Sequence, residues 1–250
     1  MSYFIADHVA KSYDGRQIIE DITIQVEKGE LVALLGVSGI GKTTLFNILS
    51  GLETPDEGQV LLKGEVVTSQ TGYASYMQQK DLLLPYKKVI DNVSLPLILK
   101  DISKKQAREQ AQIHFEHFGL KGMEYKYPHQ LSGGMRQRAA LLRSYLFSSK
   151  LMLLDEPFSA LDAITKHQIH DWYLEIVEQM QTTSLFITHD IDEAILLADK
   201  IYIMSGIPGR ITKVFDLKSG KHQGCKLTTN DFTTSEQFIT YKKQILQAIQ

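Results

Sequence analysis

The sequence predicts an α/β fold in which helices cover both faces of a parallel sheet. Four short segments, 30–35, 151–154, 184–188 and 200–204, are rich in apolar or β-forming residues, as strands buried on both faces are. Helical segments separate them, and strands that alternate with helices build parallel sheets. The stretch 81–148 has a helical pattern, which predicts a helical subdomain inserted into this core.

Helical periodicity predicts helices in four places. One follows a glycine-rich segment after the first buried strand, one is opened by Ser103, one precedes the strand 184–188, and one closes the chain at 235–249. The apolar residues at helical spacing are, in order, Leu45, Ile48, Leu49 and Leu52; Ala107, Ala111, Phe115 and Phe118; Ile169, Trp172, Tyr173, Ile176, Val177 and Met180; and Phe238, Ile245 and Ile249.

The N-terminal part of the chain favours strands that are buried on one face. Ile22, Ile24 and Val26 alternate with polar residues, and 59–62 follows a turn of Pro, Gly and acidic residues. The boundaries that we expect within one domain, 1–250, are a core of about 1–80 and 149–215, a helical subdomain of about 81–148, and a C-terminal tail and helix of about 216–250.

The composition is that of an ordinary globular chain. Its 250 residues are 43% hydrophobic and 22% charged, with a formal net charge of −2, which argues against a nucleic-acid binder driven by bulk charge. The single cysteine, Cys225, excludes an intramolecular disulfide framework and a Cys-rich zinc site. No apolar run approaches the roughly 18 residues of a membrane span, and the N-terminus lacks a secretory signal. We therefore expect a cytosolic protein whose membrane role, if it has one, comes through a partner.

The segment Gly36–Thr43 matches the pattern G-x-x-x-x-G-K-[ST], which cradles phosphates. Its glycines let the backbone wrap closely, so that several N–H groups point into one concavity at the start of a helix. Lys42 supplies a cation for the terminal phosphates, and the Thr43 hydroxyl can ligate Mg²⁺. The pattern predicts a P-loop NTPase core that binds ATP and Mg²⁺. The residues expected at the nucleotide are Gly36, Ser38, Gly39, Gly41, Lys42, Thr43 and Thr44.

Two carboxylates, Asp155 and Glu156, end the apolar segment 151–154. In a P-loop sheet the carboxyl ends of the strands open onto the nucleotide crevice. Asp155 would there belong to the Mg²⁺ shell, and Glu156 would polarise the attacking water as a general base. The alternative is a strand end that carries two solvated acids. The phosphate loop elsewhere in the chain favours the catalytic interpretation.

The segment Leu131–Arg138, with the sequence LSGGMRQR, resembles the signature motif of ATP-binding cassette (ABC) ATPases. The resemblance covers about residues 3–215. It implies N-terminal antiparallel strands beside the parallel sheet, and an ATPase that uses ATP and Mg²⁺.

The same resemblance implies roles for residues outside the three motifs. Tyr13 would stack on adenine, and Gln79 would contact Mg²⁺ and water as the glutamine of the Q-loop. Asp162, in the D-loop, would lie at the nucleotide, and His189 would reach the γ-phosphate as a catalytic residue together with Glu156 and Gln79. Gln78 is the alternative to Gln79, although Gln79 has the family's usual spacing to the following proline.

The signature motif implies a second copy of the chain. Ser132, Gly133 and Gly134 begin a helix, and in the family this motif caps the nucleotide that a second cassette holds. We therefore expect a homodimer that sandwiches two ATP molecules. Arg136, Arg138 and Arg143 follow on the same segment; a solvated helix face or electrostatics at the dimer seam explains them better than nucleic-acid binding.

Three further segments of the chain resemble those of the ATPases of nitrate, sulfonate, taurine and pyrimidine-precursor importers. The matching segments are 81–86, Asp91–Val93 and 206–211. The chain departs from the group at two places: Tyr86 stands where these ATPases usually have tryptophan, and 216–230 lacks their Pro-Arg segment. The resemblance implies a peripheral protein on the cytoplasmic face of the cell membrane, transmembrane permease subunits, and indirectly an extracytoplasmic solute-binding protein. Leu82–Tyr86 would contact the permease, or else belong to the core.

Two other functions remain as alternatives. A soluble ABC ATPase that acts on ribosomes or DNA usually carries two cassettes, a long coiled-coil insertion or a basic extension, and none is visible here. A P-loop metabolite kinase would not need the signature motif. No nucleic acid is expected as a partner.

Overall fold

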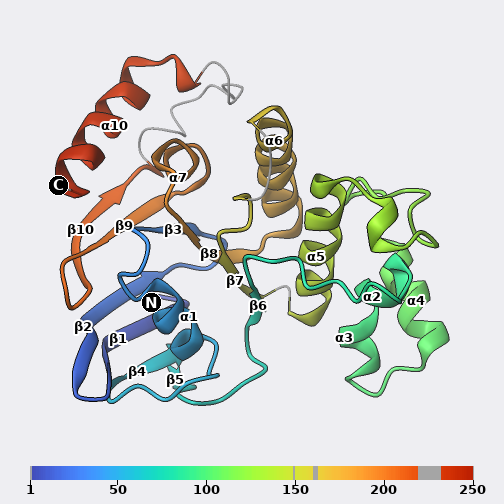
Figure 1. Cartoon of the computed structure of the whole chain (residues 1–250), viewed down its shortest axis with the longest axis horizontal. Coiled ribbons are helices and arrows are strands. Elements are labelled where there is room, and N and C mark those ends of the chain that lie inside the picture. Colours follow the sequence, from blue (N-terminus) through green and yellow to red (C-terminus); the bar gives the residue numbers. More distant parts are fainter. Residues whose placement is uncertain (1, 149, 160–162, 219–231, 250) are drawn as a thin grey trace.

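The computed structural model describes residues 2–148, 150–159, 163–218 and 232–249. They form two sheets with helices packed around them (Figure 1). The larger sheet has six strands in the order β10-β9-β3-β8-β7-β6. Its strands are β3 (Leu31–Leu35), β6 (Ser75–Met77), β7 (Leu151–Asp155), β8 (Thr183–Thr188), β9 (Lys200–Ser205) and β10 (Arg210–Asp216).

The direction of these strands confirms the α/β class. All neighbours in the larger sheet are parallel except β9 and β10, which form an antiparallel pair. Each of the four apolar segments forms a strand, and every residue of β3, β7 and β8 is buried. This burial on both faces explains why these strands read as apolar runs rather than as alternating patterns.

Alternate residues of β3 face two different cores. Leu31, Ala33 and Leu35 pack into the core that lies beneath most of the helices. Val32 and Leu34 pack into the core formed with α1 (Lys42–Leu49) and the smaller sheet. The phosphate loop, which follows β3, is therefore anchored from both faces of the sheet.

The smaller sheet is antiparallel, as the family resemblance implied. Its order is β2-β1-β4-β5, with β1 (Phe4–Tyr13), β2 (Arg16–Val26), β4 (Glu57–Leu62) and β5 (Glu65–Val66). Asp14 and Gly15 join the first two strands with φ values of 49° and 74°. Two positive φ angles in a two-residue turn match the twist of a hairpin, which explains the Asp-Gly sequence.

Between β6 and β7 the described chain forms only helices and loops. The helices are α2 (Val89–Val93), α3 (Leu95–Ile98), α4 (Lys104–Gln112), the 3₁₀ helix Pro128–Gln130 and α5 (Gly133–Phe147). Figure 1 places this helical part beyond β6, at the end of the molecule opposite the antiparallel sheet. The Ser103 hydroxyl accepts a hydrogen bond from the Gln106 N–H, so it caps α4 as expected.

Two expected helices are shorter than the periodicity predicted. Phe115 and Phe118 are buried, but α4 ends before them at Gln112 and the chain continues in tighter turns. Leu52 is 61% exposed, because α1 ends at Leu49. Gly51, with a φ of 77°, turns the chain away there. The spacing of apolar residues therefore did not predict where these two helices end.

The C-terminal half supplies the remaining helices. They are α6 (Ala163–Met180), α7 (Ile191–Leu197) and α10 (Glu236–Ile249). The expected closing helix is thus present, with Phe238 and Ile245 buried against the core and Ile249 partly buried. Among the described residues, no helix is both long and apolar enough to cross a membrane.

Candidate functional site

The phosphate loop connects β3 to α1, and three of its glycines have structural reasons to be glycine. Gly39 and Gly41 have φ values of 81° and 103°, which residues with a side chain rarely adopt. A Cβ on Gly41 would lie 2.6 Å from a methyl group of Ile19, and a Cβ on Gly36 would lie 2.6 Å from the Met204 carbonyl oxygen. The loop therefore requires glycine both for its turn and for its close packing.

Lys42 begins α1 and is almost fully buried. Its Nζ donates hydrogen bonds to the Gly36 carbonyl at 2.7 Å and the Val37 carbonyl at 2.8 Å. Burial lowers the pKa of Lys42, and the nearby carboxylates of Glu156 and Asp155 oppose that shift. The ammonium group thus lies over the loop and faces the two acids, as a phosphate-binding cation should.

Asp155 ends β7 beside the start of α1. Its Oδ2 lies 3.5 Å from the Thr43 hydroxyl and 3.5 Å from the Tyr76 hydroxyl. Burial raises the pKa of Asp155, and the charge of Glu156 raises it further. Neighbouring hydroxyl and carboxylate oxygens suit Mg²⁺, which takes few protein ligands and fills its remaining positions with water and phosphate. The pair Thr43 and Asp155 therefore fits the expected metal.

Glu156 brings together three of the expected catalytic residues. The Gln79 amide donates to its carboxylate at 3.0 Å, and the His189 Nδ1 lies 3.1 Å from it. Only 14% of the Glu156 side chain is exposed. Its φ of 44° is unusual for a residue with a side chain, and such strain is concentrated at functional sites. The cluster can orient a water molecule and accept its proton.

The structure distinguishes the two candidate glutamines. Both are exposed, but Gln79 also lies 3.4 Å from the Ser159 hydroxyl, whereas Gln78 makes no described side-chain hydrogen bond. No contact of Gln79 with Thr43 or Asp155 is described, so its metal-ligand role stays a prediction.

Tyr13 lies apart from the Glu156 cluster, at the end of β1. Its hydroxyl donates to Glu53 and also interacts with Thr44, which follows the phosphate loop. The side chain is 41% exposed. An exposed ring beside the loop is available for stacking on a base, and that role stays a prediction.

The signature segment is remote from the phosphate loop of the same chain. The Ser132 hydroxyl caps α5 by accepting from the Met135 N–H. Helix α5 packs against α2, α3 and β6, whereas α1 packs against β2 and β7, and Figure 1 shows the two helices well separated. Gly133 and Gly134 form the first turn of α5. Asp162 lies outside the described residues.

The arginines in and just after the signature segment each contact another part of the chain. Arg136 pairs with the Asp81 carboxylate at 3.3 Å, and Arg143 donates to the Asp81 and Leu82 carbonyls at 2.6 and 2.8 Å. Arg138 lies 4.9 Å from the centre of the Trp172 ring. The three arginines are therefore only partly exposed, with 38% of the Arg136 side chain accessible, and the suggested role at the dimer seam stays a prediction. Arg136 and Arg143 thus hold the segment after Gln79 against α5, whereas Arg138 packs on α6.

The segment Leu82–Tyr86 was expected either to contact a permease or to belong to the core, and its residues differ in burial. Leu82 and Tyr86 are 51% and 72% exposed, and Pro85 is exposed as well, whereas Leu83 is buried. Asn92 fixes the segment by hydrogen bonds to the Leu84 backbone. The exposed residues are therefore available for contact with a partner, whereas Leu83 belongs to the core.

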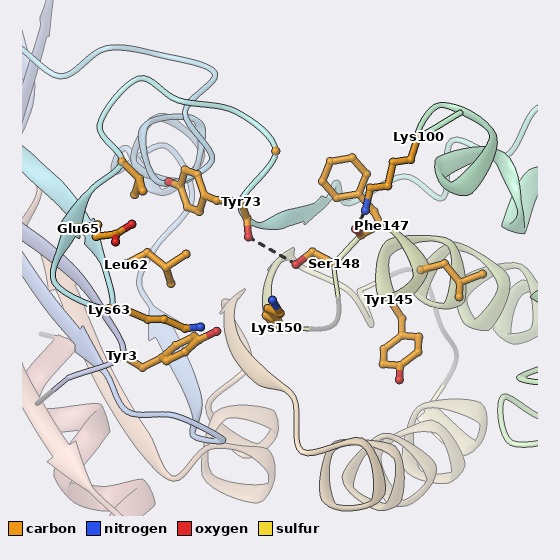
Figure 2. Close-up of a pocket in the computed structure, with 13 residues that line it drawn as sticks. Tyr3, Leu62, Lys63, Glu65, Tyr73, Lys100, Tyr145, Phe147, Ser148 and Lys150 are labelled. Carbon is orange, nitrogen blue, oxygen red and sulfur yellow. Dashed lines mark hydrogen bonds between the residues drawn. The ribbon is translucent and has the colours of Figure 1, made fainter. Parts of the chain in front are cut away.

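A cleft of about 740 Å³ lies between the antiparallel sheet and the end of α5 (Figure 2). It is separate from the phosphate loop, because none of the loop residues lines it. Three lysines, Lys63, Lys100 and Lys150, stand around it, and within the described chain none of them forms an ion pair. Aromatic residues form much of the wall: Tyr3, Tyr73, Tyr145 and Phe147. No sequence pattern predicted this cleft, because its residues come from five separate segments.

A protein-family model described as ABC transporter matches residues 19–159 of the chain. The chain belongs to this family. It is an ABC ATPase that binds nucleotide, and its relatives place it in the importer group that the sequence resembles.

Three relatives illustrate the group. The formylaminopyrimidine import ATP-binding protein ThiZ of Halalkalibacterium halodurans is 46% identical over 191 residues, which are 76% of this chain and 74% of ThiZ. The aliphatic sulfonates import ATP-binding protein SsuB of Bacillus cereus is 38% identical over 243 residues, 97% of this chain and 92% of SsuB. The taurine import ATP-binding protein TauB of Yersinia pestis is 36% identical over 234 residues, 94% of this chain and 92% of TauB.

Solved structures agree with the fold. A bacterial ABC transporter cassette in a dimeric structure has a TM-score of 0.74 at 27% identity, covering 86% of this chain and 98% of its own. A dimeric post-hydrolysis state of an ATP-binding cassette, bound to ADP and Pi, has a TM-score of 0.73 at 27% identity, covering 86% of this chain and 98% of its own.

Proposed function

We propose that this ABC ATPase energises solute uptake, by closing as a pair around ATP and transmitting that motion to a transmembrane permease. The Glu156 cluster is the observation that carries the proposal. A carboxylate held by Gln79 and His189 at 3.0 and 3.1 Å faces the Lys42 ammonium across the phosphate loop. Hydrolysis of a phosphoanhydride needs such a base next to such a cation.

Each residue has a separate task in hydrolysis. Glu156 accepts the proton of the attacking water, and His189 and Gln79 hold that carboxylate and contact the γ-phosphate side. Lys42 and the loop N–H groups bind the β- and γ-phosphate oxygens. Thr43 and Asp155 hold Mg²⁺, which when bound supplies positive charge to the phosphates.

A second copy of the chain completes each site. The chain carries two helix starts suited to phosphate, at Lys42 and at Ser132, on helices that do not pack together. Ser132, Gly133 and Gly134 of one copy would therefore cap the nucleotide held by the other. An identical pair would use the same surface twice, as isologous dimers do. The dimeric cassette at 27% identity supports this arrangement.

A crosslink tests the dimer directly. Cysteines at Ser38 and Ser132, with Cys225 replaced by serine, should be joined between copies by a bifunctional maleimide when ATP is present in the Glu156→Gln background, because the bound nucleotide lies between the two positions and leaves them too far apart for a direct disulfide. Gel electrophoresis would show a dimer band that depends on ATP and on both cysteines. A band that is independent of ATP, or a crosslink within one copy, would contradict the arrangement.

The cleft of Figure 2 is the proposed docking site for a cytoplasmic helix of the permease. It lies between the antiparallel sheet and the helical part, so a helix seated there would move with both. The protein would then sit peripherally on the cytoplasmic face of the membrane. The solute would be an anion or small organic molecule of the nitrate, sulfonate, taurine or pyrimidine-precursor type, delivered by an extracytoplasmic binding protein.

Purification of the tagged chain from its own cells tests this import role. Detergent-solubilised membranes should yield a stable complex with a polytopic membrane protein, and solute added with its binding protein should stimulate ATP hydrolysis. Recovery with ribosomes or nucleic acid, and with no membrane protein, would favour the alternative of a soluble ABC ATPase instead.

A further inference from the structure

A lysine outside every motif of the proposed site links two helices next to His189. Lys166 lies on α6, and its Nζ is 2.6 Å from Asp190 Oδ2 and 2.9 Å from Glu193 Oε2 on the first turn of α7. Only 20% of the Lys166 side chain and 2% of the Glu193 side chain are exposed. Removing one partner of a shielded pair costs far more than removing one partner of a surface pair, because the other charge is left buried without a counter-ion.

Asp190 uses its two carboxylate oxygens for different tasks. Oδ1 accepts from the N–H groups of Asp192 and Glu193 and so caps α7, at 2.9 and 3.1 Å. Oδ2 is left for Lys166. The Asp190 N–H donates to the Thr188 hydroxyl at 3.0 Å. The residue that follows His189 is therefore fixed to β8, to α7 and, through Lys166, to α6.

The charges support this link. Burial favours neutral forms, yet the pKa of Lys166 is raised, because Asp190 and Glu193 hydrogen-bond to it. The pKa of Asp190 is lowered against the same effect of burial, because Lys166 and the N–H groups of α7 stabilise its charge. His170, also on α6, lies 3.5 Å from Glu193. Two residues of α6 thus lie against the Glu193 carboxylate, and Lys166 supplies the ion pair.

We propose that Lys166 is a positioning residue for His189, because its ion pair with the Asp190 cap keeps the imidazole on the Glu156 carboxylate. The proposal rests on the proposed roles of His189 and Glu156. It goes beyond them by assigning a task to a residue whose described ion pairs are with Asp190 and Glu193 and not with the Glu156 cluster. Removal of the ammonium would leave two carboxylates unpaired beside the backbone of His189 and loosen the start of α7.

Substitution of Lys166 separates positioning from simple support. Lys166→Met keeps the length of the side chain and removes the charge. It should lower kcat for ATP hydrolysis about tenfold and change KM for ATP less than about twofold, as expected when only alignment is lost. Lys166→Arg should restore kcat to within about threefold of the original, because a guanidinium also bridges two carboxylates.

The matched control is Lys242→Met. Lys242 on α10 pairs with Asp192 at 2.7 Å, so it also places a cation at the first turn of α7, but it does not touch Asp190 or Glu193. This variant should keep kcat unchanged. If Lys242→Met lowers kcat as much as Lys166→Met, or if Lys166→Met hydrolyses ATP normally, the proposal is wrong.

Ring ¹⁵N NMR of His189 gives a readout that a merely structural role would not move. In the original chain, Glu156→Gln should shift the Nδ1 resonance, because the two groups are in contact. In a folded Lys166→Met background the same change should shift it less than half as far. An equal shift would overturn the proposal. If Lys166→Met does not fold, Lys166→Gln replaces it in both measurements.

Two variants keep this result separate from the proposed function. His189→Ala and Glu156→Gln should each abolish most hydrolysis whatever the role of Lys166. If they hydrolyse ATP normally, the proposed site is wrong; if they are inactive while Lys166→Met is normal, only the positioning role is wrong.

Discussion

The amide of Gln79 lies 3.0 Å from the carboxylate of Glu156, although 76 residues separate them in the chain. Strand register explains the contact. Met77 at the end of β6 pairs with Leu154 in the parallel strand β7. Gln79 and Glu156 each stand two residues beyond that pair, so they emerge side by side at the carboxyl edge of the sheet. The contact depends on the pairing of two strands that the sequence does not show to be neighbours.

Replacement of Glu156 by glutamine should stop hydrolysis while ATP still binds. Glutamine keeps the shape and the contacts with Gln79 and His189 but cannot accept a proton, so phosphate release should fall about 10²–10⁴-fold. Light scattering should detect a dimer with ATP and Mg²⁺. The control is Glu175→Gln on the exposed face of α6, which should behave like the original chain. A Glu156→Gln variant that hydrolyses normally would exclude Glu156 as the base.

Gly41→Ala should destabilise the fold more than Gly39→Ala, although both glycines have positive φ. A methyl group on Gly41 meets Ile19, which is fully buried and stiff at its branched Cβ, whereas one on Gly39 meets nothing within 4 Å. We expect a loss of about 2–4 kcal/mol in the free energy of unfolding for Gly41→Ala and about 1–2 kcal/mol for Gly39→Ala. Urea denaturation measures both, and equal losses would mean that backbone strain alone matters.

Sequence reasoning succeeded where one local pattern determines one local structure. The loop Gly36–Thr43 is such a case, because its glycines, lysine and threonine lie within eight consecutive residues. The positive φ angles of Gly39 and Gly41 set its turn. The apolar strands are another, since burial on both faces leaves a direct trace in composition.

Features that depend on packing between distant segments were not predictable. The cleft of Figure 2 needs the arrangement of five segments, and the link from Lys166 to Asp190 needs the crossing of α6 over α7. Asp190 directly follows His189 in the sequence, but no pattern of spacing connects it to a lysine 24 positions earlier. Leu82 and Leu83 show the same limit at single-residue scale, because neighbouring leucines take opposite environments.

Reversal of charge at the cleft should weaken the complex with the permease but not ATP hydrolysis by the chain alone. Lys63→Glu combined with Lys150→Glu replaces two cations that form no ion pair among the described residues. Co-purification of membrane protein should fall about tenfold, as charge mismatch at an interface predicts. Lys213→Glu is the control, since Lys213 also lies against an aromatic ring but on β10. Undiminished recovery would place the docking site elsewhere.

Glu30 should make the fold sensitive to acid. Burial would raise the pKa of its carboxyl, but the Glu27 N–H together with Lys218 and Lys200 outweighs burial and lowers it. A lowered pKa in the folded state gives stability that is present above the ordinary value of 4.5 and is lost as the pH falls through the folded value. Glu30→Gln should therefore cost about 1–3 kcal/mol at pH 7 and flatten the decline in unfolding free energy below about pH 4.5. Urea denaturation of both chains from pH 7 to pH 3 measures the difference. Parallel curves would show that Glu30 titrates alike in the folded and unfolded states.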